Sequence, residues 1–418
     1  MTDQPLTDLY ERKIINDPVF GFINIPKGLL YNIVKHPLLQ RLNRIKQVGL
    51  SSVVYPGAQH TRFQHSLGAF HLMSEAIAQL TAKGHFIFDS EAEAVRAAIL
   101  MHDIGHGPFS HVLENTIVRG VSHEEISLLL MERMNREMNG QLSLAIQIFK
   151  DEYPKRFLHQ LVSGQLDMDR LDYLRRDSFY TGVSEGNIGS ARIIKMLDVV
   201  NDRLVVESKG IYSIENFLTA RRLMYWQVYL HKTSVAYERM LISALLRAKE
   251  LALGGVELFA SPSLRYFLYN DIDHERFHQN PESLEHFIQL DDTDIWTALK
   301  VWSSHTDKIL STLSTGMINR RVFKVEISTD PIEDSRIQSL ADEIALQLGI
   351  TSEEAQTYFI SIPRIEKNMY NPADDSIDIL YKDGTIKNIA EASDMLNISL
   401  LSKKVKKYYL CYLHPRKT

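Results

Sequence analysis

The segment ILMHDIGHGPFSH (residues 99–111) places three histidines and an aspartate where an apolar stretch meets a turn rich in glycine and proline. The residues before that turn predict a helix over 91–104, because their apolar side chains recur at helical spacing. Ser90 and Glu93 have the spacing of a capping box at its start, and Gly105 is typical of its end. A helix is therefore expected to carry this polar cluster at its carboxyl end.

The position of His102 on this helix predicts where its side chain points. Val95, Ala98, Ile99 and His102 follow an i, i+3, i+4, i+7 pattern, which puts His102 on the face directed to the protein interior. A lone buried histidine would most often be a neutral ring hydrogen-bonded to the backbone. Asp103 follows directly, however, and burying a carboxylate is costly unless a positive charge compensates it. A divalent cation bound by both side chains would supply that charge.

Two adjacent ligands do not complete a coordination sphere, so other segments must contribute. A second helical segment offers His65 on an apolar face, and a third offers Asp167 and Asp169. Asp169 shares a helical face with Tyr173 and Asp177, which makes it the better candidate than Asp167. Mixed imidazole and carboxylate ligands favour Fe, Mn, Co, Ni or Zn over a structural zinc site, which would need cysteines.

Composition limits the class of protein. The chain has 418 residues, of which 44% are hydrophobic and 24% charged, enough for one large core and a smaller appended unit. The net charge of -5 does not favour nucleic-acid or membrane binding, and the single cysteine, Cys411, excludes an internal disulfide framework. The amino terminus lacks the pattern of a signal peptide, and no apolar run reaches the ~18 residues of a membrane span. We therefore expect a cytoplasmic protein without membrane partners.

The chain divides into two parts by pattern, and the expected fold class is mainly α. Residues 1–254 predict an all-helical domain that ends with a long helical region over 213–253. Residues 255–418 predict helices followed by a small α+β unit. The segments expected in that unit are a helix at 334–349 and strands at 322–328, 358–362, 377–384 and 408–413.

The carboxyl-terminal segment 403–418 is locally basic. It could contact nucleic acid or phosphate, but lysines in solvent beside an edge strand are the favoured interpretation. Nucleic acid is therefore only a weakly supported partner.

Five blocks occur in a fixed order: KQVGLSSVVYPGAQHTRFQHSLG (46–68), HDIGHGPFSH (102–111), SHEE (122–125), LDMDRLDYLRRD (166–177) and YLHKTS (229–234). Together they resemble the HD-domain metal-dependent phosphohydrolases, in the branch of the deoxynucleoside triphosphate triphosphohydrolases. The resemblance covers roughly residues 20–240 and is much thinner beyond about residue 300. It implies a helical HD domain that binds a divalent metal and a nucleotide.

The resemblance implies roles for particular residues. The metal ligands would be His65, His102, Asp103 and Asp169, and Mg²⁺ would be compatible as the ion that accompanies the nucleotide. The acid/base and water-orienting group would be His106, Glu114 and His123, with His111 near the scissile phosphate.

The same resemblance implies a substrate site. Arg62 and Arg221 would hold phosphate oxygens, with Tyr173 and Asp177 beside the sugar. Gln47 and Tyr229 would line the sugar, and a tyrosine close to C2′ would disfavour a ribose hydroxyl. Taken alone, each arginine is nearly as compatible with an internal salt bridge as with phosphate contact. Each tyrosine is equally compatible with an ordinary core position and with a place beside the sugar. We assign no role to His60 or His231.

Three hypotheses follow. The leading one is hydrolysis of a deoxynucleoside triphosphate to deoxynucleoside and triphosphate by metal-assisted attack of water at the α-phosphorus, in a homo-oligomer, dimer or tetramer. The second is hydrolysis of another phosphate ester at the same site, such as a nucleoside monophosphate, a cyclic nucleotide or an alarmone. The third is a nucleotide or nucleic-acid sensor whose HD site is not catalytic.

Overall fold

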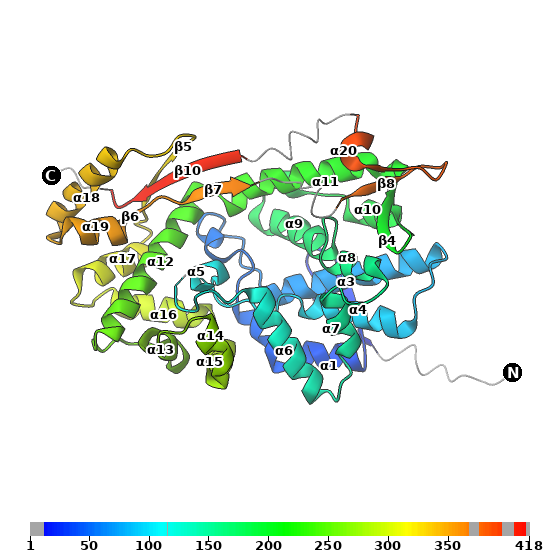
Figure 1. Ribbon diagram of the computed structural model, residues 1–418, viewed down its shortest axis with the longest axis horizontal. Coiled ribbons are helices and arrows are strands. Elements are labelled where there is room, and N and C mark those ends of the chain that lie inside the picture. The colour runs from blue at the N-terminus through cyan, green and yellow to red at the C-terminus, as the bar shows by residue number, and fades with distance from the viewer. Residues whose placement is uncertain (1–11, 115, 368–375, 395–404, 415–418) are drawn as a thin grey trace.

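The computed structural model describes residues 12–114, 116–367, 376–394 and 405–414, and helices dominate it (Figure 1). The mainly α prediction is confirmed. The helices of the first part are α1 (Leu29–Lys35), α2 (Pro37–Gln40), α3 (Arg62–Ala82), α4 (Asp89–Met101), α5 (Ser110–Glu114), α6 (His123–Glu137), α7 (Ser143–Phe149), α8 (Arg156–Val162), α9 (Met168–Thr181), α10 (Ser190–Met196), α11 (Ile211–Met224) and α12 (Lys232–Leu253). Those that follow are α13 (Pro262–Tyr269), α14 (His274–Gln279), α15 (Pro281–Gln289), α16 (Asp292–Trp302), α17 (Lys308–Ile318), α18 (Asp334–Leu348), α19 (Ser352–Phe359) and α20 (Ile389–Ala392).

The strands form three small sheets. In chain order they are β1 (Arg12–Asp17), β2 (Gly21–Pro26), β3 (Leu197–Val200), β4 (Arg203–Glu207), β5 (Lys324–Ser328), β6 (Ile360–Ser361), β7 (Arg364–Lys367), β8 (Asp378–Leu380), β9 (Ile386–Asn388) and β10 (Val405–Tyr412). The hairpins β1–β2 and β3–β4 lie within residues 1–254, so the prediction that this part is entirely helical is wrong in detail.

Helix α3 packs against both α4 and α9, and these three helices carry segments singled out in the sequence. The close approach of α3 to α9 depends on Gly68. A Cβ atom built there would lie 1.9 Å from Asp172 Oδ1 and 2.1 Å from Arg176 Nη2, so no larger residue fits without moving both. Glycine therefore leaves room for the buried Asp172–Arg176 pair at the point where these two helices meet.

The predicted helix 91–104 differs at both ends from α4. It begins two residues earlier, and the Glu91 side chain, rather than that of Glu93, accepts a hydrogen bond from the backbone N–H of Phe88 (2.8 Å). It ends at Met101, before Gly105. A Cβ at Gly105 would lie 2.1 Å from the carbonyl oxygen of His123, so this glycine permits close contact with α6 rather than terminating α4.

The helical region predicted over 213–253 is interrupted. It comprises α11, one turn of π-helix at Tyr225–Tyr229, and α12. The π-helical turn projects Tyr225 and Tyr229 into the same cavity. Such a turn within a helix is frequently found at functional sites.

The carboxyl-terminal strands and helix α18 overlap the predicted segments. β10 pairs with β5 on one side and with β6 and β7 on the other, in antiparallel register. Residues 408–412 therefore lie next to β5 as well as to β6 or β7 and are not the edge strand expected for the basic segment, whereas the lysine-bearing residues 405–407 pair with β7 alone. Residues 403–404 and 415–418 of that segment lie outside the described residues.

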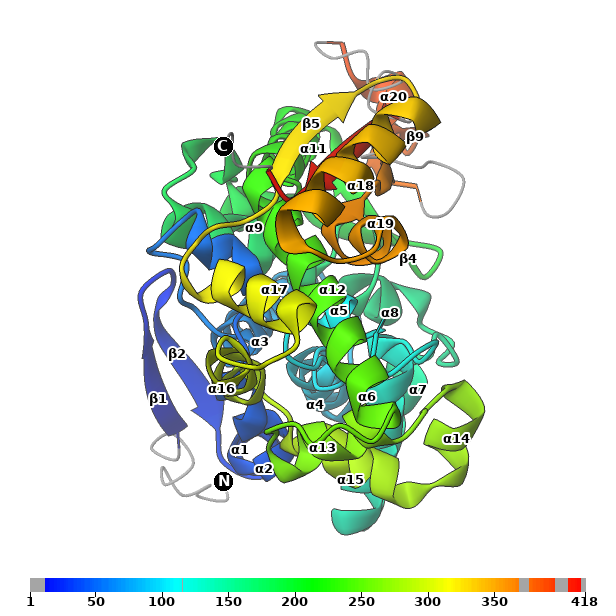
Figure 2. The same cartoon turned by 90° about the vertical axis from the view of Figure 1, so that its left-hand side faces the viewer.

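The two predicted parts pack against each other across residue 254. Helix α12 runs through the centre of the view in Figure 2 and packs against α13, α17 and α19. β8 pairs in parallel with β4, which lies about 170 positions earlier in the chain. The buried apolar residues of both parts also form one continuous cluster. The boundary at residue 254 stays a prediction. None of the described helices is long and apolar enough to cross a membrane.

Candidate active site

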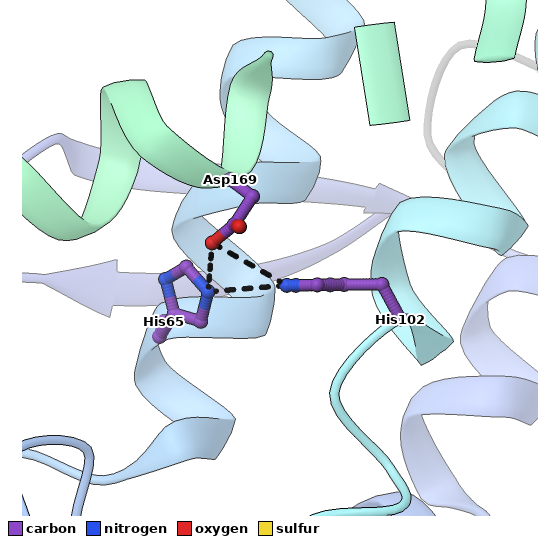
Figure 3. A group of neighbouring side chains, drawn as sticks. All are labelled: His65, His102 and Asp169. Atoms are coloured by element: carbon purple, nitrogen blue, oxygen red, sulfur yellow. Dashed lines mark hydrogen bonds and ion pairs between the residues drawn. The ribbon is translucent and has the colours of Figure 1, made fainter. Parts of the chain in front are cut away.

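Three side chains from three helical segments converge in the interior (Figure 3). His65 comes from the first turns of α3, His102 follows the last residue of α4, and Asp169 lies in the first turn of α9. His65 Nε2 lies 3.3 Å from His102 Nε2 and 3.1 Å from Asp169 Oδ1, and His102 Nε2 lies 3.6 Å from that oxygen. An ion with ligands at about 2.1 Å holds neighbouring ligand atoms about 3.0 Å apart in an octahedron and about 3.4 Å apart in a tetrahedron. The three separations therefore fit a divalent ion.

Asp103 lies beside this trio. Its Oδ1 is 3.4 Å from His102 Nε2, and its Oδ2 is 3.8 Å from His65 Nε2. The same Oδ2 accepts a hydrogen bond of 2.6 Å from Arg62 Nη1. Different oxygens make these two approaches, and the group whose ligand atoms all lie within 4.8 Å of one another contains His65, His102 and Asp169 without Asp103. The ligand role expected for Asp103 stays a prediction, and Arg62 pairs with its buried carboxylate.

The second nitrogen of each histidine is held by a specific partner. His102 Nδ1 lies 2.6 Å from the carbonyl oxygen of Ile99, which directs Nε2 toward the other two side chains. His65 Nδ1 lies 2.7 Å from Asp172 Oδ2, and this buried carboxylate also accepts from Arg176 Nε at 2.9 Å. Metal-binding histidines commonly make such contacts, which fix the ring orientation and the tautomer.

Asp172 and Arg176 are site residues that the sequence interpretation missed. Both are fully buried, and Arg176 extends the chain of contacts to Asp17 on β1, at 2.7 Å. The available signal was their i, i+4 spacing of opposite charges on a helix that also carries Asp169. Nothing in the local sequence indicates that His65 lies opposite them.

The charges of the trio support cation binding. Burial by itself would lower the pKa of His65, but hydrogen bonds to Asp169 and Asp172 raise that pKa to about 10. Burial would likewise raise the pKa of Asp169, whereas His102 and His65 hold it well below the usual range. The carboxylates that raise the pKa of His65 would equally attract a divalent cation, which would compete with the proton on that ring.

A second group of polar side chains adjoins Asp103. His106 Nδ1 lies 3.3 Å from Asp103 Oδ1, and the His106 ring lies 4.0 Å from the ring of His123. His123 Nδ1 is 3.0 Å from Glu114 Oε1. These contacts place Glu114, His123 and His106 in a row beside the candidate metal ligands, and each histidine has a carboxylate near its Nδ1. His111 lies in α5, but its side chain lies outside the described part of the structure.

A cavity of about 380 Å³ lies next to these groups. Five of the six predicted substrate residues line it: Gln47, Arg62, Tyr173, Asp177 and Tyr229. Other residues lining it were not predicted, including Lys46, Val48, Leu50, Phe109, Val112, Tyr225 and Glu238. The cavity therefore combines cationic groups, phenols and an apolar wall.

The predicted site residue Asp177 is fixed at the cavity wall by two neighbours. Its Oδ1 lies 2.6 Å from His60 Nε2, and its Oδ2 accepts a hydrogen bond of 2.7 Å from the Tyr229 hydroxyl. Burial, followed by the charge of Asp177, raises the pKa of Tyr229 well above its ordinary value, so the phenol stays protonated. His60, to which we assigned no role, holds Asp177 in place and stacks on Tyr180 at 4.4 Å.

Arg221 and Asp167 lie elsewhere. Arg221 Nη1 donates to Gln165 Oε1 at 3.1 Å, and Arg221 is not among the described residues that line the cavity. The phosphate role expected for Arg221 stays a prediction. Asp167 caps the start of α9 and pairs with Arg170, which explains its buried carboxylate without a metal.

These features define a class: a helical protein with a histidine- and aspartate-rich centre that fits a divalent ion beside a cavity. The HD domain model matches residues 62–176, and the HD associated region model matches residues 188–257. A crystal structure of a phosphohydrolase from Bacteroides thetaiotaomicron VPI-5482 is 85% identical, covers 97% of this chain and 100% of that chain, and superposes with a TM-score of 0.95. The chain belongs to the HD-domain phosphohydrolases, a family whose HD domains bind divalent metals.

Two more distant relatives bear on the branch of the family. The uncharacterized protein YwfO of Bacillus subtilis is 29% identical over 422 residues, 98% of this chain and 94% of that protein. The deoxynucleoside triphosphate triphosphohydrolase SAMHD1 homolog of Dictyostelium discoideum is 29% identical over 355 residues, 80% of this chain but only 64% of that protein.

Proposed function

We propose that this chain hydrolyses deoxynucleoside triphosphates to deoxynucleosides and inorganic triphosphate. The observation that carries the proposal is a cavity whose wall combines apolar and phenolic side chains with Arg62, the residue that pairs with Asp103 beside the metal-fitting trio. Arg62 belongs both to the cavity wall and to the metal-fitting group, through Asp103. A ligand that is anionic at one end and apolar at the other suits such a cavity. The similarity to the Dictyostelium triphosphohydrolase further supports a nucleotide.

The proposed metal ligands are His65, His102, Asp103 and Asp169, for Fe, Mn, Co, Ni or Zn, with Mg²⁺ accompanying the nucleotide. When bound, a divalent ion would acidify a water molecule and offset negative charge on the phosphates. Arg62 would bind phosphate oxygens, and His111 would lie near the scissile bond. Arg221 would approach the phosphates only if its contact with Gln165 is exchanged for one with the substrate.

In the proposed reaction the oxygen of water forms a bond to the α-phosphorus, and the bond between that phosphorus and the 5′ oxygen breaks. His106, His123 and Glu114 would accept the proton of the water and return one to the 5′ oxygen of the leaving deoxynucleoside. Histidine suits both transfers because its ordinary pKa lies near neutrality. Loss of one such acid or base typically slows a reaction by roughly 10²–10⁴-fold.

The proposed sugar contacts come from Gln47, Tyr173, Asp177 and Tyr229. Tyr229 and Asp177 are hydrogen-bonded to each other, so the phenol has a fixed position against which a 2′-hydroxyl would clash. The apolar side chains of Val48, Leu50 and Phe109 would cover the base.

The test is a substrate panel with identification of products. The purified protein is incubated with each dNTP, with NTPs, and with monophosphate, cyclic and alarmone nucleotides, in the presence of Mn²⁺, Co²⁺, Ni²⁺ or Mg²⁺. Release of intact triphosphate from dNTPs supports the proposal, whereas only pyrophosphate or orthophosphate contradicts it. Hydrolysis of another ester alone favours the second hypothesis, and nucleotide binding without turnover favours a sensor.

A pair of variants tests the site within the same assay. Asp103→Asn is expected to abolish turnover. Glu75→Gln, on an exposed position of α3, is expected to leave it unchanged. Persistent turnover in metal-stripped Asp103→Asn protein would contradict the metal assignment.

The proposal includes a homo-oligomer, dimer or tetramer. Exposed apolar side chains on the β1–β2 hairpin support it, since Ile14 is 57% and Phe22 68% exposed in the single chain. Light scattering of the purified protein tests it, and a monomer at all concentrations would contradict it.

A further inference from the structure

A second cluster of metal-binding side chains lies on the surface, formed by Glu125, His274 and His278. Glu125 is in the first turn of α6, and the two histidines are one turn apart on α14. His274 Nε2 lies 2.9 Å and His278 Nε2 lies 2.7 Å from the same oxygen, Glu125 Oε1. Two histidines at i, i+4 on a helix direct their rings to one side, as in zinc-binding helices.

The spacing of the three donor atoms suits a transition-metal ion. All three lie within 4.8 Å of one another. Ligands at about 2.1 Å from a tetrahedral ion lie about 3.4 Å apart, so an entering ion needs the Glu125 carboxylate to withdraw by about half an ångström. Glutamate has three rotatable side-chain bonds, and the Glu125 side chain is 33% exposed, so this shift is sterically accessible.

The backbone around the cluster is held by other contacts. Phe277, between the two histidines on α14, is buried and packs edge-on against Phe287. Asp273 caps the start of α14 by accepting from the backbone N–H of Arg276 at 2.9 Å. The helix that carries both histidines is therefore held in place by contacts other than those with Glu125. Their side chains are 57% and 31% exposed, which leaves open positions for water.

We propose that Glu125, His274 and His278 form a second transition-metal site, which takes Zn²⁺ or a similar ion such as Ni²⁺ or Cu²⁺. Imidazole nitrogens with one carboxylate are typical ligands of these ions, and the exposed position leaves the remaining coordination to water. This site is separate from the buried trio and does not depend on the proposed function.

A bound ion would join α14 to α6 close to the catalytic candidates. Glu125 is two residues from His123, which begins α6 and contacts Glu114. The segment before α6 already approaches α14, because a Cβ at Gly120 would lie 3.8 Å from His274 Cβ, and Arg119 pairs with Asp271. The ion would therefore restrain the start of α6 from the outside.

The test compares Zn²⁺ binding in three proteins by equilibrium dialysis with elemental analysis and by calorimetry. These are the wild type, His274→Ala/His278→Ala, and the control His71→Ala. His71 faces Glu75 at 3.5 Å on α3, so the control removes one imidazole from a histidine–carboxylate pair without a second histidine. The double variant is expected to bind one ion fewer per chain than the wild type and the control. Equal stoichiometry and affinity in all three would overturn the proposal and leave a hydrogen-bonded cluster only.

Two further measurements locate the ion that the double variant fails to bind. His102→Ala/Asp169→Ala protein is expected to retain the surface site, so Co²⁺ added to it should give visible absorption bands. A quadruple variant that also carries His274→Ala/His278→Ala should not show these bands. Zn²⁺ should raise the melting temperature of the wild type more than that of His274→Ala/His278→Ala. Identical cobalt spectra with and without the surface histidines would overturn the assignment.

Discussion

Replacing Asp172 by asparagine tests whether the contacts behind His65 prepare the metal site. Asp172 is 0% exposed, and one of its oxygens lies 2.7 Å from His65 Nδ1 while both approach Arg176. Burial alone would raise the pKa of Asp172, but Arg176 and His65 lower it, so the group is a carboxylate in the fold. Asparagine keeps the shape and removes the charge that orients the ring.

The size of the effect depends on which partners His65 and Arg176 keep in this variant. Losing an outer partner of a metal-binding histidine typically lowers metal affinity by about 10–100-fold, or about 1.4–2.7 kcal/mol. Arg176 keeps its contact of 2.7 Å with Asp17, so its guanidinium is not left without a carboxylate. The loss of folding free energy is therefore expected near ~1–3 kcal/mol, below the ~3–5 kcal/mol of a fully broken buried pair.

The matched control is Asp17→Asn. This variant removes the other carboxylate of Arg176, but Asp17 makes no contact with His65 among the described residues, and its Oδ1 accepts from the N–H groups of Val19 and Phe20. Both variants are expected to unfold at lower urea concentration. Only Asp172→Asn should weaken Mn²⁺ or Co²⁺ binding, measured by calorimetry on the folded protein. Equal metal affinities in the two variants would refute the orienting role of Asp172.

Three other outcomes are expected. Hydrogen bonds to Asp169 and Asp172 raise the pKa of His65 from 6.5 to about 10, so protonation of His65 should stabilise the metal-free protein fully below pH 6.5 and contribute less as the pH rises toward 10. Metal affinity should increase over the same interval, because the metal competes with that proton. Urea unfolding with a chelator and calorimetry measure the two effects, and a flat pH profile contradicts the prediction. Gly68→Ala should lower the free energy of unfolding by ~1–3 kcal/mol and weaken metal binding, because the new methyl group overlaps Asp172. An unchanged melting temperature would show instead that α3 can move away from α9. Burial raises the pKa of Asp292 from 3.8 to about 6, so ionisation of Asp292 opposes folding as the pH rises through that interval. Asp292→Asn should therefore have a larger free energy of unfolding than the wild type at pH 8, and the difference should shrink near pH 4. Urea unfolding at both pH values measures this, and the reverse order contradicts it.

The central features of the site were predictable because they follow local rules. Helical spacing turned His102 inward and favoured Asp169 over Asp167, and the structure brings both to His65. The ligand roles themselves stay predictions. The start of α4 was less accurately predicted because its N-cap is Phe88, which has no capping oxygen, so that only Glu91 of a capping box is present to mark the start at Asp89.

Other features depend on packing between distant segments. His60 reaches Asp177, and Asp17 reaches Arg176, across more than a hundred positions of the chain, and no local pattern encodes such pairs. Gly105 illustrates the same limit, because a glycine after a helix is a common ending signal, whereas here its small size admits the carbonyl oxygen of His123. The position of residues 408–412 of β10 beside β5 and beside β6 or β7 likewise follows from a strand order that the sequence does not encode locally.

The parallel pairing of β4 with β8 has a consequence for synthesis on the ribosome. β4 and its hairpin partner β3 leave the ribosome long before residues 378–380, so one edge of the hairpin stays without its neighbour while most of the remaining chain is made. Ribosome-bound chains arrested before β8 should therefore be cleaved by protease near this hairpin, and chains arrested after it has emerged should resist. The nascent protein would be vulnerable at this edge long after the residues of the candidate metal centre have been translated.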